Sequence, residues 1–311
     1  MEKDANIYVA GHRGMVGSAI CRLLEREGFH SVLTRSRADL DLRRQDEVAA
    51  FFAAERPAYV FLAAAHVGGI EANCSRKGDF ILDNLEIQTN VMGVAHRTGV
   101  RKLLFLGSSC IYPKFAEQPI REDSLLTGPL EPTNDAYAVA KIAGLMTARY
   151  LKQQYDSNFI SMMPTNLYGP NDNFDPASSH VMAALIRKFV EAAESDAEMV
   201  TIWGTGRPRR EFLHVDDAAA AALYLMENYD ETDTVNIGWG IDCSILELAE
   251  MIAKVVGFSG RIVTDTDKPD GTPRKLLDVS RMKDLGWQPS ITLRDGIVDA
   301  VDWYRKNRVE A

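Results

Sequence analysis

Short apolar runs alternate with segments of helical periodicity through the first half of the chain. The run Ile7–Ala10 predicts a buried strand, and apolar residues at helical spacing from Val16 to Leu24 predict a helix directly after it. Strands are then expected at 31–34, 59–63, 102–106 and 159–163, with helices between them at 45–55, 84–99 and 137–155. This order predicts an α/β fold built on a doubly wound parallel sheet with helices on both faces, the Rossmann arrangement.

The pattern changes after Pro164. Residues 166–171 read Asn-Leu-Tyr-Gly-Pro-Asn, which is turn-rich, and the apolar segments beyond them are shorter and less regular. Strand-like segments at 211–215 and 234–237 flank a helix-like segment and are expected to return to the first domain. We therefore expect a Rossmann domain of residues 1–167 and about 208–238, and a second, smaller α/β substrate lobe of about 168–207 and 239–311.

Charge and composition narrow the possible partners. The 311 residues carry a formal charge of −9 without a long basic run, so we expect no nucleic-acid partner. The apolar stretches are strand-length, shorter than the roughly 20 residues of a membrane span, and no signal peptide is visible. The four cysteines are scattered, without Cys-x-x-Cys or a zinc spacing, which predicts free thiols, no metal and a cytoplasmic location.

A glycine-rich turn lies between the first strand and the first helix. It reads Gly11-His12-Arg13-Gly14-Met15-Val16-Gly17. Glycines allow a ligand to approach the backbone, and the positive end of the helix dipole favours an anion, so this place in the fold predicts a pyrophosphate site. The spacing Gly-x-x-Gly-x-x-Gly alone is a weak signal, because glycine-rich turns are common.

The residues after the second strand predict which dinucleotide binds. An NAD site usually has an acidic residue there to hold the ribose 2′-hydroxyl. This chain has Arg35 and Arg37 instead, and Arg13 lies in the glycine turn. Guanidinium groups suit a 2′-phosphate, so we expect NADP(H), held by Arg13 and Arg37. The alternative, that the arginine is a solvated loop charge without a binding role, is open for one of Arg35 and Arg37.

Tyr137 and Lys141 are four residues apart on an expected helix, about thirty residues after Ser108. This spacing places both side chains on one helical face. We expect the ammonium to lower the pKa of the tyrosine, so that Tyr137 can exchange a proton with substrate. The alternative is an ordinary exposed pair, but the order after a glycine turn favours catalysis.

These motifs, in this order, resemble the extended short-chain dehydrogenase/reductase family. The resemblance covers nearly the full chain and is most specific in longer blocks, which lie at 106–114, 130–134, 210–217 and 268–275. These blocks are similar to those of the GDP-sugar 3,5-epimerase/4-reductases of that family. The resemblance implies NADPH-dependent epimerisation of GDP-4-keto-6-deoxy-D-mannose at C3 and C5, then reduction at C4 to GDP-L-fucose.

The resemblance also implies roles for two further residues. Cys110 would be the base and His180 the acid of the epimerisation, while Ser108, Tyr137 and Lys141 serve the reduction. From the residues alone, Cys110 fits a buried packing thiol as well as a catalytic one. His180 fits equally well as a helix-start residue with a local hydrogen bond. A homodimer is implied too, through the helices expected at 84–99 and 137–155.

The binding residues implied by the resemblance fall into two sets. The cofactor set comprises Gly11, His12, Arg13, Gly14, Met15, Val16, Gly17, Arg37, Asp41, Leu42, Ala64, Leu106, Gly107, Ser109, Lys141, Pro164, Asn166, Leu167 and His180. The substrate set comprises Lys188, Trp203, Arg210 and Asp270, with Arg274 as a weaker candidate. Cations suit a pyrophosphate, and an indole suits a base or sugar.

Three other functions remain open at this point. A sister enzyme making GDP-L-colitose would share nearly every motif and epimerise only at C5. A nucleotide-sugar 4-epimerase would hold NAD tightly, which the arginines and the Cys110–His180 pair disfavour. A non-catalytic NADP-binding regulator commonly loses the tyrosine or the lysine, and this chain keeps both.

Overall fold

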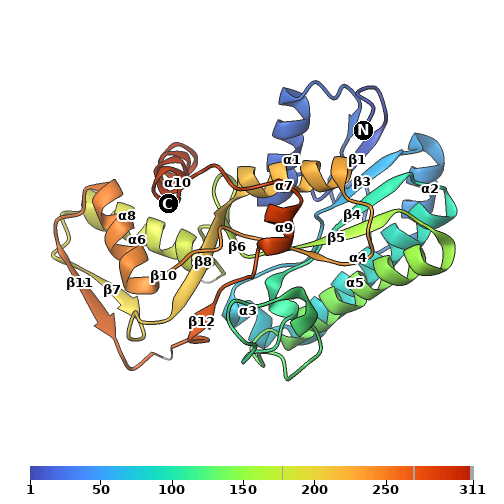
Figure 1. The fold of residues 1–311 in the computed structure, drawn as a ribbon. Coiled ribbons are helices and arrows are strands. Elements are labelled where there is room, and N and C mark those ends of the chain that lie inside the picture. The colour runs from blue at the N-terminus through green and yellow to red at the C-terminus, as the bar shows by residue number, and fades with distance from the viewer. Residues whose placement is uncertain (177, 269, 309–311) are drawn as a thin grey trace.

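The central feature is a parallel sheet of six strands in the order β2-β1-β3-β4-β5-β9 (Figure 1). The computed structural model describes residues 1–176, 178–268 and 270–308. The strands are β1 (Ile7–Ala10), β2 (Val32–Leu33), β3 (Tyr59–Leu62), β4 (Lys102–Leu106), β5 (Phe159–Pro164) and β9 (Val235–Ile237). All but β2 are fully buried, because helices cover both faces, and their sequences are therefore almost continuously apolar.

Helices cover the two faces of this sheet in separate layers. On one face α1 (Met15–Arg26) lies against α7 (Val215–Asn228), and their buried residues share a core with alternate strand residues such as Val9 and Phe61. The other face carries α2 (Gln45–Glu55), α4 (Lys77–Arg97) and α5 (Asp135–Tyr155). The predicted α/β class with a doubly wound parallel sheet is confirmed.

A smaller lobe is built around β8 (Arg209–His214). This strand pairs with β10 (Asp242–Ser244), β12 (Arg274–Lys275) and β6 (Asn166–Tyr168). Its apolar core lies among α6 (Val181–Glu194), α8 (Ile245–Val256) and α10 (Leu293–Asn307). A separate parallel pair joins β7 (Met199–Trp203) to β11 (Arg261–Asp265). The chain returns to the Rossmann domain after β8. Although β8 pairs within the lobe, the next helix, α7, and strand β9 belong to the Rossmann layers.

Short elements lie within the connections between the longer ones. They are α3 (Ile70–Ser75), α9 (Ser280–Asp284) and the 3₁₀ turns η1 (Ser109–Ile111) and η2 (Glu122–Ser124). The carboxyl ends of β4 and β5 face the lobe, and η1 directly follows β4 (Figure 1). Ligands of such sheets bind beyond these strand ends, so this is where a site is expected.

The helix expected at 84–99 is longer than the sequence indicated. It begins at Lys77, because a charged first turn is held to α5 by an ion pair of 2.8 Å between Lys77 Nζ and Asp135 Oδ1. That turn carries few apolar residues, so its periodicity gave no signal. The helix ends at Arg97, before Gly99.

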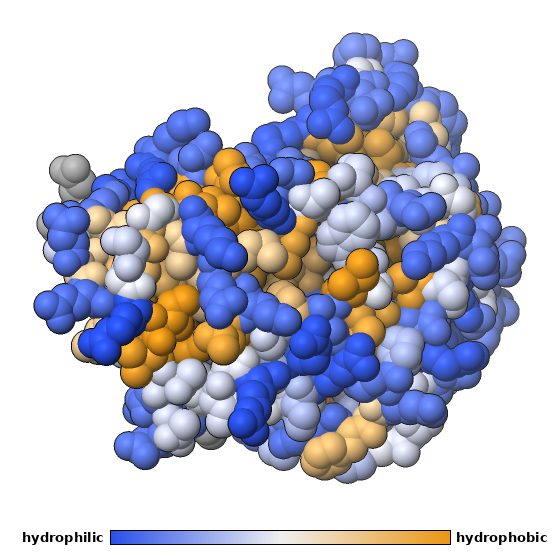
Figure 2. Space-filling view, turned by 60° about the vertical axis from the view of Figure 1, so that its left-hand side comes forward, coloured by the Kyte–Doolittle hydropathy of each residue, from blue (hydrophilic) through white to orange (hydrophobic). Residues whose placement is uncertain are grey.

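The surface is largely hydrophilic. With the lobe side turned forward, polar and charged residues dominate and apolar residues form scattered patches between them (Figure 2). Among the described residues, no helix combines the length and the apolar character needed to cross a membrane.

Candidate active site

The β1–α1 turn is formed by close backbone contacts that only glycine permits. Gly11 has φ +86°, and a Cβ on it would lie 2.8 Å from the Cα of Ala64, at the end of β3. A Cβ on Gly17 would lie 2.2 Å from the Gly11 carbonyl oxygen. The turn is therefore folded tightly against α1 and the neighbouring strand.

The N-terminus of α1 is open to a ligand. Its N-cap is Gly14, which is exposed and has no side chain to bond the free backbone N–H groups, and no acidic residue lies in the first turn. Met15 and Val16 are half-buried against the core, so their side chains anchor the turn. His12 is half-buried, and burial and the adjacent Arg13 lower its pKa. These groups leave an uncapped helix end with no negative charge, which suits a pyrophosphate.

The arginines after β2 differ in their surroundings. Arg35 pairs with Glu55 and lies 5.2 Å from the centroid of the Phe51 ring, so its half-buried side chain is held against α2. Arg13 and Arg37 are exposed, and neither makes a hydrogen bond or ion pair with another described residue. Arg35 is thus the structural arginine of the two that follow β2.

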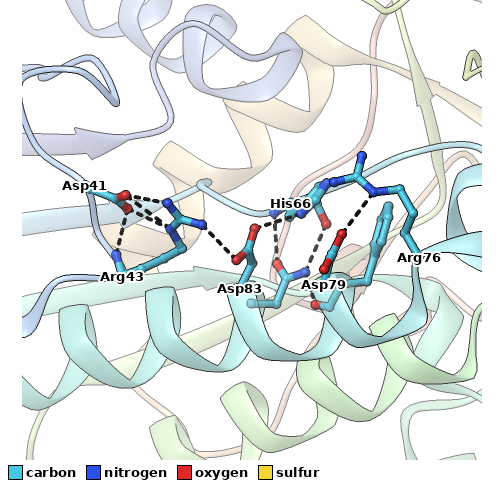
Figure 3. Close-up of polar contacts among 8 residues, drawn as sticks. Asp41, Arg43, His66, Arg76, Asp79 and Asp83 are labelled. Atoms are coloured by element: carbon cyan, nitrogen blue, oxygen red, sulfur yellow. Dashed lines mark hydrogen bonds and ion pairs between the residues drawn. The ribbon is translucent and has the colours of Figure 1, made fainter.

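Asp41 lies at one end of a chain of ion pairs (Figure 3), and the carbonyl of the next residue, Leu42, accepts from Asn90 Nδ2 at 3.0 Å. Arg43 binds Asp41 at 2.6 Å and Asp83 at 3.0 Å, and Asp83 contacts the ring of His66 at 2.9 Å. The hydrogen bonds from Arg43 lower the pKa of Asp41 to about 2, so this carboxylate stays ionised. The network fixes the segment after β2 relative to the segment after β3, which contains Ala64.

Tyr137 and Lys141 lie in the first turns of α5, next to the end of β4. The Lys141 ammonium donates to the Leu106 carbonyl at 2.8 Å and lies 5.8 Å from the centroid of the Tyr137 ring and 4.8 Å from that of Phe105. Ser108 Oγ accepts from the backbone N–H of Cys110 at 3.2 Å and lies close enough to Tyr137 to act on the pKa of its phenol. Serine, tyrosine and lysine side chains therefore meet at one strand end.

The expected lowering of the tyrosine pKa is wrong for the protein without ligands. Burial raises the pKa of Tyr137, and the neighbouring Cys110 raises it further, against the smaller effect of the Ser108 hydrogen bond. Burial also lowers the pKa of Lys141 to about 7. The sequence showed the spacing of the two groups but not their removal from water, which disfavours both charged forms.

Cys110 is half-buried among polar groups rather than packed in an apolar core. Asn134 Nδ2 lies 3.2 Å from its Sγ, and Lys275 Nζ lies 3.5 Å from it. His180 is the N-cap of α6, where its side chain makes no capping hydrogen bond. It is exposed, yet desolvation and the charge of Lys275 lower its pKa. Lys275 therefore contacts Cys110, and its charge also acts on His180.

The remaining cofactor candidates form the carboxyl edge of the sheet. The Gly107 N–H donates to the Met162 carbonyl at 2.9 Å, and Ser109 is buried in η1. Pro164 ends β5, and Asn166 Nδ2 donates to the Glu211 carbonyl at 2.8 Å. Leu167 packs against the main core. These residues thus form the carboxyl edge of the sheet.

The expected substrate residues lie in the lobe, around Trp203. This indole is 65% exposed, with Lys188 Nζ 5.7 Å and Lys268 Nζ 5.4 Å from its ring. Such an exposed aromatic ring between two cations suits a base or sugar carrying phosphates. The carboxylate of Asp270 is bound at 2.8 Å by both the backbone and the hydroxyl of Thr205, so it closes the turn beside Trp203.

Two arginines of the lobe have different surroundings. Arg210 is half-buried, its NH1 bonds the carbonyls of Arg209 and Thr272, and burial lowers its pKa. Arg274, the weaker substrate candidate, instead binds Asp242 at 2.5 Å, as does Arg209 at 2.8 Å.

Three residues of the site did not emerge from the sequence. Asn134 and Lys275 contact Cys110, and Lys268 contacts Trp203. All three lie in the blocks 130–134 and 268–275, but only the folded chain brings them to a cysteine and an indole distant in sequence.

Comparison with known proteins decides the family. The model of the NAD dependent epimerase/dehydratase family matches residues 7–238. The chain belongs to this family. Within it, GDP-L-fucose synthase 1 of Arabidopsis thaliana is 57% identical over 306 residues, covering 98% of this chain and 95% of the relative. The GDP-L-fucose synthase of Escherichia coli K12 is 52% identical over 311 residues, covering 97% of each.

A solved member of the same fold contains the phosphorylated dinucleotide. The GDP-mannoheptose C4 reductase from Campylobacter jejuni with NADP bound superposes with a TM-score of 0.92 at 40% identity. The match covers 98% of this chain and 99% of that one, so both lobes of the epimerase/dehydratase family fold are shared.

Proposed function

We propose that this protein catalyses the reaction of a GDP-L-fucose synthase. It epimerises GDP-4-keto-6-deoxy-D-mannose at C3 and C5 and reduces the C4 ketone to give GDP-L-fucose. The observation that carries the proposal is that Ser108, Tyr137 and Cys110 meet at one strand end. One site thus combines a proton donor for a ketone oxygen with a thiol, in a chain 57% identical to a GDP-L-fucose synthase.

The β1–α1 turn fits NADP(H). The uncapped end of α1 at Gly14 would receive the pyrophosphate, because its backbone N–H groups have no side-chain partner. Arg13 and Arg37, which are exposed, would receive the 2′-phosphate. When bound, NADPH supplies the hydride for C4. The cofactor site would be completed by residues at or after the carboxyl ends of the parallel strands and by the residue directly before α6. These residues are Asp41, Leu42, Ala64, Leu106, Gly107, Ser109, Pro164, Asn166, Leu167 and His180.

Reduction at C4 requires a proton for the ketone oxygen. Tyr137 and Ser108 would bind this oxygen, and Tyr137 would donate its proton as negative charge develops there. The raised pKa of Tyr137 keeps the phenol protonated in the resting site. Lys141 would stabilise the phenolate that remains and bind the ribose hydroxyls.

Epimerisation uses the same C4 oxygen. The ketone acidifies the hydrogens on C3 and C5, because the carbanion is an enolate whose charge lies on that oxygen. Cys110 would remove the proton, and His180 would return one on the opposite face. Donors that stabilise the oxygen in the reduction therefore assist the epimerisation as well.

The lobe would hold the GDP portion. Lys188 and Arg210 would neutralise phosphate charge, Trp203 would pack against the base or sugar, and Asp270 would position the turn beside it. The substrate would thus bridge the lobe and the strand end.

A homodimer and a cytoplasmic location complete the proposal. Val139, Ala143, Met146 and Tyr150 form an apolar stripe along α5, with Val139 44% and Tyr150 54% exposed. Leu82 on the adjacent α4 is 60% exposed. Pairing these helices with those of a second copy would cover the stripe. The four cysteines are free, which fits a reducing compartment.

The test compares substrates and cofactors. GDP-4-keto-6-deoxy-D-mannose or its 3-deoxy analogue is supplied with NADPH or NADH, and nucleotide absorbance is followed. The proposal expects rapid NADPH oxidation with the first sugar, less with NADH, and a loss of about 10²–10⁴-fold in Tyr137→Phe. Preference for the 3-deoxy sugar would indicate a GDP-L-colitose synthase. Tightly held NAD without net turnover would indicate a 4-epimerase, and NADPH binding without turnover a regulator.

A further inference from the structure

Lys275 is a cation near the strand end with no role in the proposed reduction. It is the last residue of β12, and its Nζ lies 3.5 Å from Cys110 Sγ. Its charge also acts on His180, whose pKa it helps to lower. Lys275 itself makes no ion pair with a carboxylate among the described residues. Its ammonium therefore contacts the thiol proposed as the base of the epimerisation.

The position of Lys275 is fixed on both sides. β12 pairs with β8 through Lys275 opposite Arg210, and the next residue, Leu276, is bonded to the loop after η1. In those bonds the Leu276 N–H donates to Gln118 Oε1 at 2.8 Å, and the Leu276 carbonyl accepts from Ile120 at 2.7 Å. The ammonium is thus carried by an anchored strand rather than by a free loop.

Two donors converge on the Cys110 sulfur. Asn134 Nδ2 lies 3.2 Å from it and Lys275 Nζ lies 3.5 Å from it. A thiolate accepts several such bonds, whereas a thiol is a weak acceptor that also has a proton to donate. A neighbouring lysine favours the thiolate, which is the reactive form of cysteine. Tyr137 is a further titratable group beside Cys110, and its phenol is neutral when protonated.

We propose that Lys275 is a positioning residue for carbon deprotonation, holding Cys110 as a thiolate directed at the substrate. This inference rests on the proposed function. In the step, the C–H bond breaks, its proton forms the S–H bond on Cys110, and the electron pair enters the enolate. His180 then donates its proton to the opposite face of that carbon. Solvent returns Cys110 and His180 to their starting states.

The test measures the alkylation of Cys110 by iodoacetamide between pH 6 and 10 in the full-length protein, by mass spectrometry of its peptide. Lys275→Met should move the midpoint of this profile upward by about one pH unit, a roughly tenfold lower rate at pH 7. Lys275→Arg should restore it. Lys283→Met, an exposed lysine on α9, is the matched control, and the exposed Cys74 is the internal control.

Two activity measurements separate this role from a structural one. Lys275→Met should slow the exchange of substrate hydrogens with deuterated water at least tenfold. Oxidation of GDP-L-fucose by NADP⁺, which needs only the reduction groups, should stay within about threefold of the wild type. An unchanged Cys110 midpoint with an unchanged limiting rate at high pH overturns the inference. If the wild type does not act on the GDP-sugar, the proposed function is wrong. The pH midpoint of Cys110 alkylation still tests whether Lys275 stabilises the Cys110 thiolate.

Discussion

At the scale of one residue, Lys141 is a buried amine that the proposed reaction needs but whose charge destabilises the folded protein. It is 2% exposed, and its ammonium has only a carbonyl and two rings as partners among the described residues. Its pKa is lowered to about 7, because water is excluded and no carboxylate compensates. The sequence revealed the Tyr137–Lys141 spacing but not this burial, and so it gave the wrong direction for the pKa of Tyr137.

Replacing Lys141 with methionine should therefore stabilise the protein without nucleotide. At pH 6 the free energy of unfolding is expected to rise by about 2 kcal/mol. This figure includes the cost of losing the hydrogen bond to the Leu106 carbonyl. The folded wild type releases the proton above about pH 7, whereas the unfolded chain keeps it to its ordinary pKa of 10.5. The cost of burying the charge is thus complete below pH 7, and it declines as pH rises towards 10.5.

Urea unfolding of both proteins at pH 6 and pH 9 measures this effect. The advantage of Lys141→Met should be smaller at pH 9 than at pH 6. Lys254→Met, at an exposed position on α8, should change stability by less than about 0.5 kcal/mol. A variant less stable than the wild type at pH 6 would show that the buried amine stabilises the fold.

At the scale of single elements, the strands differ in how well the sequence predicts them. The Rossmann strands are buried on both faces and read as apolar runs, so β1, β3, β4 and β5 were placed to within a residue. In the lobe, β12 consists of Arg274 and Lys275 alone, which carry no hydrophobic signal. Its position depends on pairing with β8, more than sixty residues away in sequence.

The β1–α1 turn gives a prediction at this scale. In Gly17→Ala the added Cβ would lie 2.2 Å from the Gly11 carbonyl oxygen and 2.9 Å from the Cα of His12. These are backbone atoms, so the turn must shift, and the Kd for NADPH should rise at least about tenfold. Gly78→Ala, in α4, meets no atom within 4 Å and should bind as the wild type does. Fluorescence titration with NADPH compares them, and near-equal affinities would separate this turn from cofactor binding.

At the scale of the whole molecule, the proposed site depends on both lobes of the chain. The Rossmann domain supplies Ser108, Cys110, Tyr137 and Lys141, while the lobe supplies His180 and Lys275. The sequence placed most of these groups through local motifs. It did not show that Lys275 reaches Cys110, because that contact depends on how the lobes are joined.

The apolar stripe on α5 predicts the assembly. Val139→Glu should convert a dimer at micromolar concentration into a monomer, because the carboxylate would be buried between two copies of the helix. Val298→Glu, on α10 and 40% exposed, is the matched control and should leave the dimer intact. Light scattering distinguishes these states. A monomeric wild type, or a dimer that persists in Val139→Glu, would contradict an interface through α4 and α5.

The central claim is that one site carries out both carbon epimerisation and ketone reduction. Its most direct test is the reaction of the wild-type protein with GDP-4-keto-6-deoxy-D-mannose and NADPH in deuterated water, with the product analysed by NMR. The account predicts GDP-L-fucose with deuterium at both C3 and C5 and one NADPH consumed per product. A reduced sugar with hydrogen retained at both carbons would contradict it.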